Sequence, residues 1–228
     1  MNIHTPSHIA IIPDGNRRWA KKNGLSVAEG HRKGFEAFEP IIQRAAELNI
    51  AYVTFWAFST ENWKRTQEEV GLLLQLFQSI AMSAFLDRLQ KNNVRLKIIG
   101  DLQAFPQNLI NTIKKSIELT KDNDKITVTI GLNYGGRDEI LRAVNKILAE
   151  KRLSVSQEEF SNFLDTAGMP EPDLIIRTGG EQRLSGLLPW QGIYSELHFT
   201  DLLWPEFSPS ELDNALEWYS YRERRMGK

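Results

Sequence analysis

Short apolar runs alternate with longer amphipathic stretches along almost the whole chain. The runs predict strands, and several are continuously apolar, which is typical of strands buried on both faces of a parallel sheet. They are His8–Ile12, Tyr52–Phe58, Val94–Ile99, Ile126–Leu132, Asp173–Arg177 and Glu196–Phe199. The amphipathic stretches predict helices over residues 30–48, 67–92, 106–121, 136–151, 156–165 and 209–225. This alternation predicts an α/β fold, with a mainly parallel central sheet of about six strands flanked by helices.

The predicted helix over residues 67–92 is apolar on more than one side. Val70, Leu73 and Phe77 belong to one helical stripe, whereas Leu72 and Leu76 lie on further faces. Two interpretations stay open and are compatible with each other. The helix is a central core helix or dimer contact, or it forms one wall of a long apolar tube.

Composition narrows the class of protein. The 228 residues contain no internal repeat and no Gly/Ser-rich linker, so we expect a single domain over residues 1–228. The 28 basic and 29 acidic residues argue against non-specific binding of nucleic acid. The absence of cysteine excludes disulfides, thiolate metal sites and a cysteine nucleophile. Without a signal peptide or an apolar run of about 20 residues, the sequence predicts a cytoplasmic protein with no transmembrane segment.

The first predicted strand ends in a loop of polar groups suited to a phosphate. This loop is Pro13-Asp14-Gly15-Asn16-Arg17-Arg18-Trp19, and ligands of open α/β sheets bind beyond the carboxyl ends of strands. Arg17 and Arg18 can grip phosphate oxygens, and Gly15 lets the backbone approach a ligand closely. Asp14 suits Mg²⁺, which takes one or two carboxylates together with substrate phosphates. The alternative is an ordinary turn in which Asp14 caps a helix.

Two further strands end in loops of similar chemistry. Residues 58–65 are Phe-Ser-Thr-Glu-Asn-Trp-Lys-Arg, and residues 173–185 carry Arg177, a Gly-Gly pair, Arg183 and Ser185. Each loop alone is also explained by turn chemistry, and His31 after Gly30 suits either a phosphate contact or a helix cap. Three strand ends that offer cations and hydroxyls together favour a substrate that bears phosphates.

These loops, in this order, resemble the cis-prenyltransferase family, the undecaprenyl and other Z-polyprenyl diphosphate synthases. The resemblance covers almost the whole chain and rests on more than five collinear motifs. They are His8–Trp19, Gly30–Gly34, Ala57–Trp63, Asn133–Arg137, Asp173–Ser185, Tyr194–Asp201 and Trp204-Pro205. The sequence contains no Asp-Asp-x-x-Asp run of the kind that carries Mg²⁺ in trans-prenyltransferases, which agrees with this resemblance.

The resemblance implies a Mg²⁺-dependent condensation of isopentenyl diphosphate onto an allylic diphosphate such as farnesyl diphosphate. Asp14 would hold the metal and the allylic diphosphate, Glu196 would be a further metal-side residue, and Asn62 would lie near the proton that is lost. The resemblance assigns Arg177, Arg183 and Ser185 to isopentenyl diphosphate, and Trp63, Arg65 and Glu69 to a loop that closes over the substrates. The full set of implied substrate-binding residues is Gly15, Asn16, Arg17, Arg18, Trp19, His31, Ser59, Thr60, Glu61, Trp63, Arg65, Arg177, Arg183 and Ser185.

The resemblance also implies a tunnel, a product and a partner. The family's apolar tunnel lies between the sheet and two helices, here residues 30–48 and 67–92. Its product would be a long-chain polyprenyl diphosphate of the undecaprenyl type that carries cell-wall glycans and partitions to the membrane, so a loose membrane association stays open. A short- or medium-chain product is the alternative, because the tunnel's far end sets the length. Ala57, Ala81, Ala84 and Val128 would leave that end open, and Trp56, Phe77 and Phe85 would close it. The ending Arg224–Lys228 resembles a segment that reaches the partner subunit's site in a homodimer.

Two departures from the family's pattern concern the substrate sites. Val27 stands where many members carry an arginine, so one diphosphate contact is missing or is supplied by Arg17. Gly186-Leu-Leu-Pro189 replaces the usual Asn-Phe-Leu-Leu, which leaves the backbone geometry there open. A different class of function, a non-catalytic partner subunit or lipid-binding relative, is disfavoured because such relatives lose the acidic and cationic loop residues that this chain retains. A phosphatase or nucleotide enzyme is weaker still, since we find no nucleophile or adenine pocket.

Overall fold

The computed structural model describes residues 5–81 and 84–222, and of residues 80, 81, 84 and 85 it describes the backbone without the side chains. Over these residues the strands are β1 (His8–Ile12), β2 (Tyr52–Ser59), β3 (Val94–Ile99), β4 (Ile126–Tyr134), β5 (Leu174–Arg177) and β6 (Glu196–Phe199). The helices are α1 (Asn16–Lys22), α2 (Val27–Glu36), α3 (Phe38–Glu47), α4 (Gln67–Ala81), α5 (Ala84–Lys91), α6 (Gln107–Thr120), α7 (Gly136–Ala149), α8 (Gln157–Ser161) and α9 (Pro209–Ser220). Short 3-10 helices are η1 (Thr60–Lys64), η2 (Leu102–Ala104) and η3 (Trp204–Glu206).

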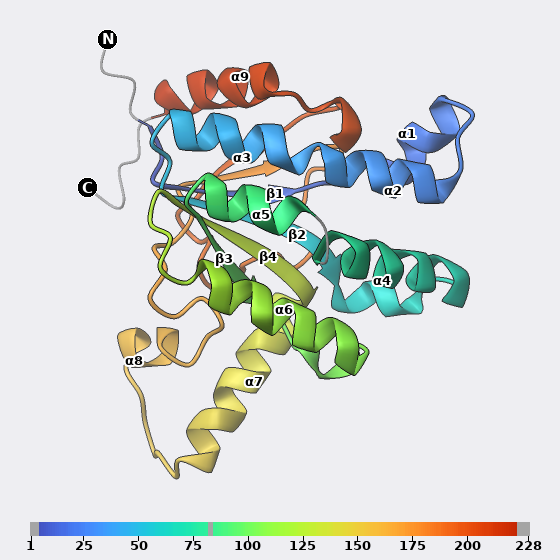
Figure 1. Cartoon of the computed structure of the whole chain (residues 1–228). Helices are drawn as coiled ribbons and strands as arrows, with labels where there is room; N and C mark the ends of the chain where they lie inside the picture. Colours follow the sequence, from blue (N-terminus) through green and yellow to red (C-terminus); the bar gives the residue numbers. More distant parts are fainter. Residues whose placement is uncertain (1–4, 82–83, 223–228) are drawn as a thin grey trace.

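The strands form a parallel sheet in the order β3-β4-β2-β1-β5-β6, which confirms the predicted single-domain α/β fold (Figure 1). β1 lies between β2 and β5, and all five of its residues are buried. Burial on both faces explains why this strand is a continuous apolar run rather than an alternating one. Because all strands run the same way, the loops that follow β1, β2, β4 and β5 start at one edge of the sheet.

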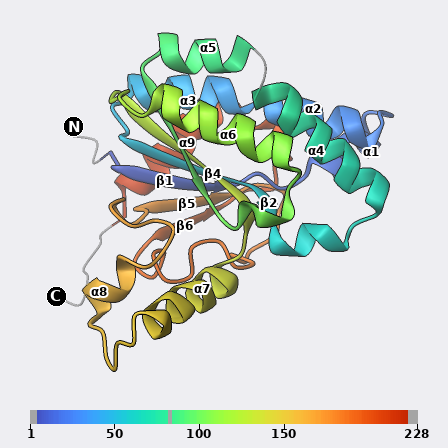
Figure 2. The same ribbon diagram turned by 60° about the horizontal axis from the view of Figure 1, so that its bottom comes forward.

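Helices cover both faces of the sheet, as Figure 2 shows, with α7 and α8 on one side and α3, α6 and α9 on the other. The larger core joins β1, β2 and β4 to α3, α5 and α9, around stacked rings of Phe38 and Phe55 whose centroids are 4.4 Å apart. A smaller core on the opposite face contains Tyr134, Leu187 and Leu188, which are fully buried. Among the helices of the described residues, none is long and apolar enough to cross a bilayer.

The helices differ from the predicted stretches at several places; α8 and α9, for example, end at Ser161 and Ser220 rather than at residues 165 and 225. The stretch 30–48 is two helices, because Pro40 in the first turn of α3 has no N–H to donate to Glu36 and its ring clashes with that carbonyl. α1 was not predicted, since it begins directly after Gly15 and has no apolar stripe. The stretch 67–92 is described as α4 and α5, and residues 82 and 83 between them lie outside the described residues.

Candidate active site

The loops after β1 and β5 meet at the carboxyl edge of the sheet around the carboxylate of Asp14. Arg177 Nη2 donates to Asp14 Oδ2 at 2.9 Å, and Arg18 Nη2 donates to Oδ1 at 3.1 Å. Arg177 Nη1 also donates to Ser185 Oγ at 2.8 Å and to the carbonyl of Arg183 at 2.6 Å. Arg177 is buried, and its Nε has no hydrogen-bond partner among the described atoms. The site therefore holds a desolvated cation with one N–H unused.

Backbone contacts hold the Asp14 loop in place. The carbonyl of Asp14 accepts from Thr178 Oγ1 at 2.7 Å and from Trp204 N at 3.0 Å. Gly15 has φ +116°, a backbone conformation that residues other than glycine rarely adopt. Gly179 has φ +86°, and a Cβ at that position would lie 2.4 Å from Arg18 Nη2. Glycine at 179 thus makes room for the Arg18 guanidinium, which donates to the Gly179 carbonyl at 2.6 Å.

A second charged cluster lies where α2 meets the start of α4. The Glu69 carboxylate accepts from Arg65 at 2.8 Å, lies 3.3 Å from His31 Nε2 and pairs with Arg17 at 3.7 Å. Burial opposes ionisation of Glu69, but Arg65, His31 and Arg17 together lower its pKa. Burial, with the nearby charges of Arg65 and Arg17, lowers the pKa of His31 despite its hydrogen bond to Glu69. Glu69 therefore stays charged and holds the three basic side chains beside Asp14's loop.

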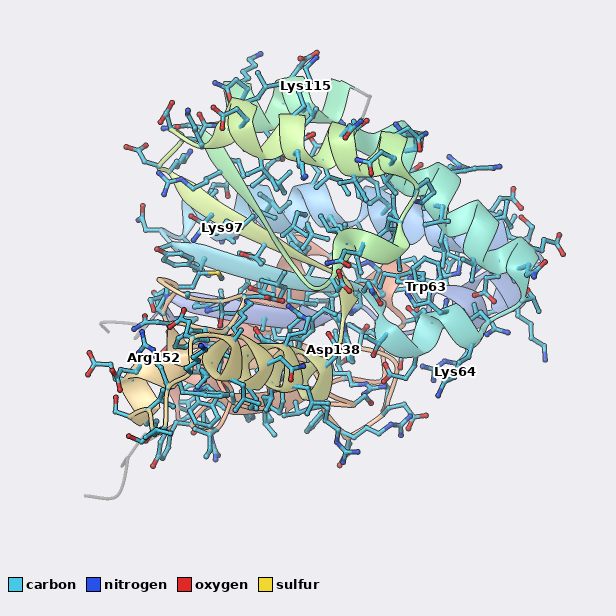
Figure 3. The ribbon with its side chains drawn as sticks, turned by 90° about the horizontal axis from the view of Figure 1, so that it is seen from below. Trp63, Lys64, Lys97, Lys115, Asp138 and Arg152 are labelled. Carbon is cyan, nitrogen blue, oxygen red and sulfur yellow. The ribbon has the colours of Figure 1, made fainter. Side chains whose placement is uncertain are left out.

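The loop after β2 begins with a compact turn. Ser59 N donates to Asn62 Oδ1 at 3.1 Å, so Asn62 caps η1 and its side chain is held in place. Trp63 donates from Nε1 to Asn133 Oδ1 at 2.8 Å, and its ring packs edge-on against Phe58 with centroids 5.0 Å apart. Trp63 thus lies against the core, whereas the exposed Lys64 points away from the molecule (Figure 3).

Two polar cavities open at this edge and share Pro13, Asp14, Asn16, His31 and Arg65. One has a volume of about 380 Å³, and the other, of about 700 Å³, is rich in basic residues. The larger adds Gly15, Arg17, Arg18, Ala20, Lys21, Leu25 and Val27 to the shared residues. The smaller adds Ser59, Glu61, Asn62, Arg177, Ser185 and apolar side chains of α2, β2 and α4. Most of the predicted binding residues therefore line these two cavities, which share part of their lining.

An apolar cavity of about 80 Å³ adjoins the smaller polar one. The two share Phe35, Phe38, Ala57 and Phe77 as lining residues. Beyond these four, the apolar cavity is lined by side chains of α3, β3, β4, α5 and α6, including Val128. An apolar cavity thus lies directly beside the polar edge of the sheet.

A family model described as "Putative undecaprenyl diphosphate synthase" matches residues 12–227 of this chain. The chain belongs to the undecaprenyl diphosphate synthase family. Members of this family named isoprenyl transferase are similar over nearly the full length. That of Chromobacterium violaceum is 47% identical, covering 98% of this chain and 88% of its own. That of Fusobacterium nucleatum is 45% identical, with 100% and 98% covered.

Solved structures of prenyl diphosphate synthases share the fold of this family member. Lavandulyl diphosphate synthase from Lavandula x intermedia, in complex with dimethylallyl diphosphate, has a TM-score of 0.94 and 35% identity, covering 98% of this chain and 99% of its own. A probable undecaprenyl diphosphate synthase from Campylobacter jejuni has a TM-score of 0.83 and 32% identity, with both chains fully covered. The chain is therefore a prenyl-transferring enzyme.

Some predicted residues lie apart from the cavities of this family member. Glu196 is at the amino end of β6, level with Leu174, and its carboxylate accepts from Arg222 at 2.9 Å. Arg177, which contacts Asp14, is level with the other end of β6. Within one chain, the structure therefore does not bring Glu196 to Asp14.

Four further predicted residues lie beside the cavities rather than on their described walls: Trp19, Thr60, Trp63 and Arg183. Arg183 is exposed and pairs with Glu181. Of the residues expected at the far end of a tunnel, Trp56 lines the smaller polar cavity, Ala57 and Phe77 line this cavity and the apolar one, and Val128 lines the apolar one; the side chains of Ala81, Ala84 and Phe85 and the segment Arg224–Lys228 lie outside the described residues.

The sequence analysis gave no structural role to several residues of this edge, although some of them belong to the quoted motifs. Thr178 and Trp204 hold the Asp14 backbone, and Gly34 abuts the side chain of Asn16. Phe35 and Phe38 separate the polar and apolar cavities. The two aromatic residues carried a signal, because they lie three apart on a predicted helix, but their neighbours in space come from other elements.

Proposed function

We propose that the protein is a Mg²⁺-dependent cis-prenyltransferase that joins isopentenyl diphosphate to an allylic diphosphate. The observation that carries this proposal is the cation-lined edge around Asp14, which leads into an apolar cavity behind Phe35 and Phe38. A diphosphate needs the first of these environments and a prenyl chain needs the second. The dimethylallyl diphosphate bound to the lavender enzyme supports an allylic diphosphate here.

The residues divide between two diphosphates. The allylic diphosphate would lie in the basic cavity, where Arg17, Arg18 and His31 meet the backbone of Gly15 and the amide of Asn16. Val27 lines this cavity, and the nearby Arg17, Lys21 and Arg65 supply charge where other members use an arginine. Isopentenyl diphosphate would bind at Arg177, Ser185 and Arg183. The unused Nε of Arg177 supports this assignment, since a phosphate oxygen would accept from it.

The proposed reaction forms one carbon–carbon bond and breaks one carbon–oxygen bond. C4 of isopentenyl diphosphate bonds to C1 of the allylic substrate, and diphosphate leaves C1 with the bonding electrons. A proton then leaves C2, which forms the new cis double bond. Fixed guanidiniums stabilise the charge that develops on the leaving diphosphate. Asn62, held by Ser59, would lie near the departing proton, and Glu61 lines the wall beside it.

Mg²⁺ fits this site as a metal shared with the substrate. The Asp14 side chain is 31% exposed and lies where the two polar cavities meet. No group of three or more His, Asp or Glu side chains suited to a metal occurs among the described residues. Mg²⁺ is commonly bound through one or two carboxylates plus substrate phosphates, and Asp14 offers such a carboxylate. When bound, the metal would neutralise charge on the departing diphosphate.

The proposed product is a long-chain polyprenyl diphosphate of the undecaprenyl type, a cell-wall lipid carrier that leaves a cytoplasmic enzyme for the membrane. The family model and the similarity to the C. jejuni protein support this choice. A short-chain product is a second candidate. It is favoured by the small apolar cavity of about 80 Å³ and by the similarity to lavandulyl diphosphate synthase.

We also propose that the protein is a homodimer. Leu141, Val144 and Leu148 are exposed at 63%, 37% and 63% along one side of α7, an apolar stripe that a second copy would cover. Light scattering should give twice the 26.2 kDa chain mass, and a Leu141→Glu, Leu148→Glu variant should give the monomer. A wild-type monomer at micromolar concentration would contradict this proposal.

One incubation tests the activity and the product together. The purified protein receives Mg²⁺, farnesyl diphosphate and labelled isopentenyl diphosphate, and the dephosphorylated product is separated by chain length. Labelled Z-prenyl product that disappears with EDTA is expected. Absence of product with any allylic primer would refute the proposed function, and the chromatographic length distinguishes the two product classes.

A further inference from the structure

A buried hydrogen-bond network at the first turn of α7 has no part in the chemistry proposed above. Glu139 is 1% exposed. Its Oε2 accepts from Tyr134 Oη at 2.6 Å and from Gln191 Nε2 at 3.1 Å, and its Oε1 accepts from Asp165 N at 2.9 Å. Gln191 also donates to Thr166 Oγ1 at 2.8 Å. Segments from the end of β4, the loop before β5 and the loop after β5 therefore meet on one carboxyl group.

A carboxyl group in this position is costly unless it has a specific use. Burial raises the pKa of Glu139, and the nearby charge of Asp165 adds to this rise against the hydrogen bonds from Tyr134 and Gln191. Apolar side chains of similar volume often replace buried charges with no loss of stability. Buried polar networks can instead select one arrangement of the chain, and here both oxygens of Glu139 accept hydrogen bonds, whereas Gln191 Oε1 has no partner among the described atoms. The position of Glu139 is therefore explained by the chain segments that its carboxyl group holds together, and not by a contribution to the free energy of unfolding.

The segment that Glu139 holds is the loop over residues 183–191. Its Ser185 Oγ and Arg183 carbonyl both accept from Arg177. Ser185 and Leu188 have φ of +53° and +46°, a left-handed conformation that costs non-glycine residues roughly 1–2 kcal/mol each. A loop with two residues in this conformation keeps it only where contacts with the surrounding structure hold the loop in place.

Two hydrogen bonds connect this loop to the start of α7. In its middle, the Gly186 carbonyl accepts from Gly136 N at 2.8 Å. A Cβ on Gly136 would lie 2.0 Å from Pro189 Cδ, so loop and helix are in close contact. At its end, Gln191 is bound to Glu139. Figure 3 places Asp138, the residue before Glu139, at this end of α7.

We propose that Glu139 is a positioning residue that, by holding Gln191, keeps loop 183–191 in the conformation in which Ser185 and Arg183 meet isopentenyl diphosphate. This inference rests on the proposed function. None of the residues that line the allylic cavity belongs to this loop, and all but Arg65 follow β1 or lie on α1 and α2; Arg177 alone connects the loop to Asp14 among the contacts described above. Loss of Glu139 should therefore weaken the use of one substrate and spare the other.

Glu139→Gln is the sharpest substitution, because all three partners of Glu139 are donors. A glutamine keeps the shape but turns an NH₂ group toward at least one of these donors. We expect the KM for isopentenyl diphosphate to rise at least tenfold, with the KM for farnesyl diphosphate changed less than twofold. Gln191→Leu should also raise the KM for isopentenyl diphosphate. The double variant should show a KM close to that of the more affected single variant, because both substitutions break the same hydrogen bond between Gln191 and Glu139.

Asn123→Ala is the matched control. Asn123 is also buried, and its amide donates to the Val94 carbonyl at 2.9 Å in the turn before β4, at the opposite edge of the sheet. This variant should lower the melting temperature and leave the ratio of the two KM values unchanged. Gln191→Leu carries the test if Glu139→Gln does not fold.

The outcomes separate this inference from the proposed function. Folded variants with an unchanged KM for isopentenyl diphosphate, or with equal rises in both KM values, overturn the positioning role and leave the function standing. A wild-type protein that neither condenses nor binds the two diphosphates overturns the function, and the positioning role falls with it.

Discussion

Gly34→Ala should separate activity from stability. Gly34 is buried in α2, and a Cβ added there would lie 2.1 Å from Asn16 Oδ1 and 2.7 Å from its Cγ. The Asn16 side chain must therefore leave its position at the junction of the two polar cavities. Alanine also favours a helix over glycine by about 1 kcal/mol, whereas overpacking costs about 1–3 kcal/mol. The net loss of unfolding free energy is thus about 0–2 kcal/mol.

The effect on catalysis should be larger than the effect on folding. A hydrogen bond to a charged group contributes about 1.5–3 kcal/mol, which corresponds to a fall of about 10- to 150-fold in kcat/KM for the allylic diphosphate. The assay is steady-state kinetics with farnesyl diphosphate varied, together with urea unfolding of the same preparation. Gly71→Ala is the matched control, since Gly71 lies in α4 with nothing within 4 Å of the added Cβ. It should gain about 1 kcal/mol and keep wild-type kinetics. Wild-type kcat/KM in Gly34→Ala would refute the role given to Asn16.

Three further predictions concern charge. Asp14→Asn should lower kcat at least 100-fold at saturating Mg²⁺, because the carboxylate would be both metal ligand and partner of Arg177. The circular dichroism spectrum should stay that of the wild type. Turnover near that of the wild type would exclude the metal assignment. Arg183→Ala should raise the KM for isopentenyl diphosphate about tenfold or more through loss of a charge-assisted contact, and an unchanged KM measured with that substrate varied would remove Arg183 from the site. Burial lowers the pKa of His8 from 6.5 to about 4, against the opposing effects of the Pro170 carbonyl and Asp173. Between these values the unfolded chain binds a proton that the folded chain does not, so about 3 kcal/mol of unfolding free energy should be lost as pH falls from 6.5 to 4. Denaturant titrations that show the same pH slope in His8→Gln would contradict this cause.

The strands were predicted almost residue by residue because burial on both faces leaves a direct mark on the sequence. β1, β3 and β6 have the predicted bounds, and β2 and β4 run one and two residues further. Those extensions end in Ser59 and Tyr134, polar side chains that hydrophobicity alone does not assign to a strand. The helix break before Pro40 had its signal in the proline, but the apolar spacing continued across it.

The sequence predicted which residues belong to the candidate site better than it predicted their contacts. The parallel topology brings Asp14, Asn62 and Arg177 to one edge, as the strand-end argument expects. Glu196 is the first residue of the predicted strand, so in a parallel sheet it lies at the amino end, away from Asp14; only the resemblance assigned it to the metal. Glu139 was missed for another reason. An acid in the first turn of a helix usually serves the helix dipole at the surface, and only the packing of loop 183–191 shows that this one is buried.

The pairing of Asp14 with Arg177 connects the stability of this edge to its use. A buried guanidinium without a counter-charge is strongly destabilising, and the Arg177 side chain is only 6% exposed. Asp14 supplies that counter-charge from a carboxylate that is itself 31% exposed. On the proposed assignment, isopentenyl diphosphate would replace Asp14 as the partner of Arg177, which would free the carboxylate for Mg²⁺ at the neighbouring allylic diphosphate. The proposed site would thus exchange one set of ion pairs for another, with the buried Arg177 guanidinium paired at both stages.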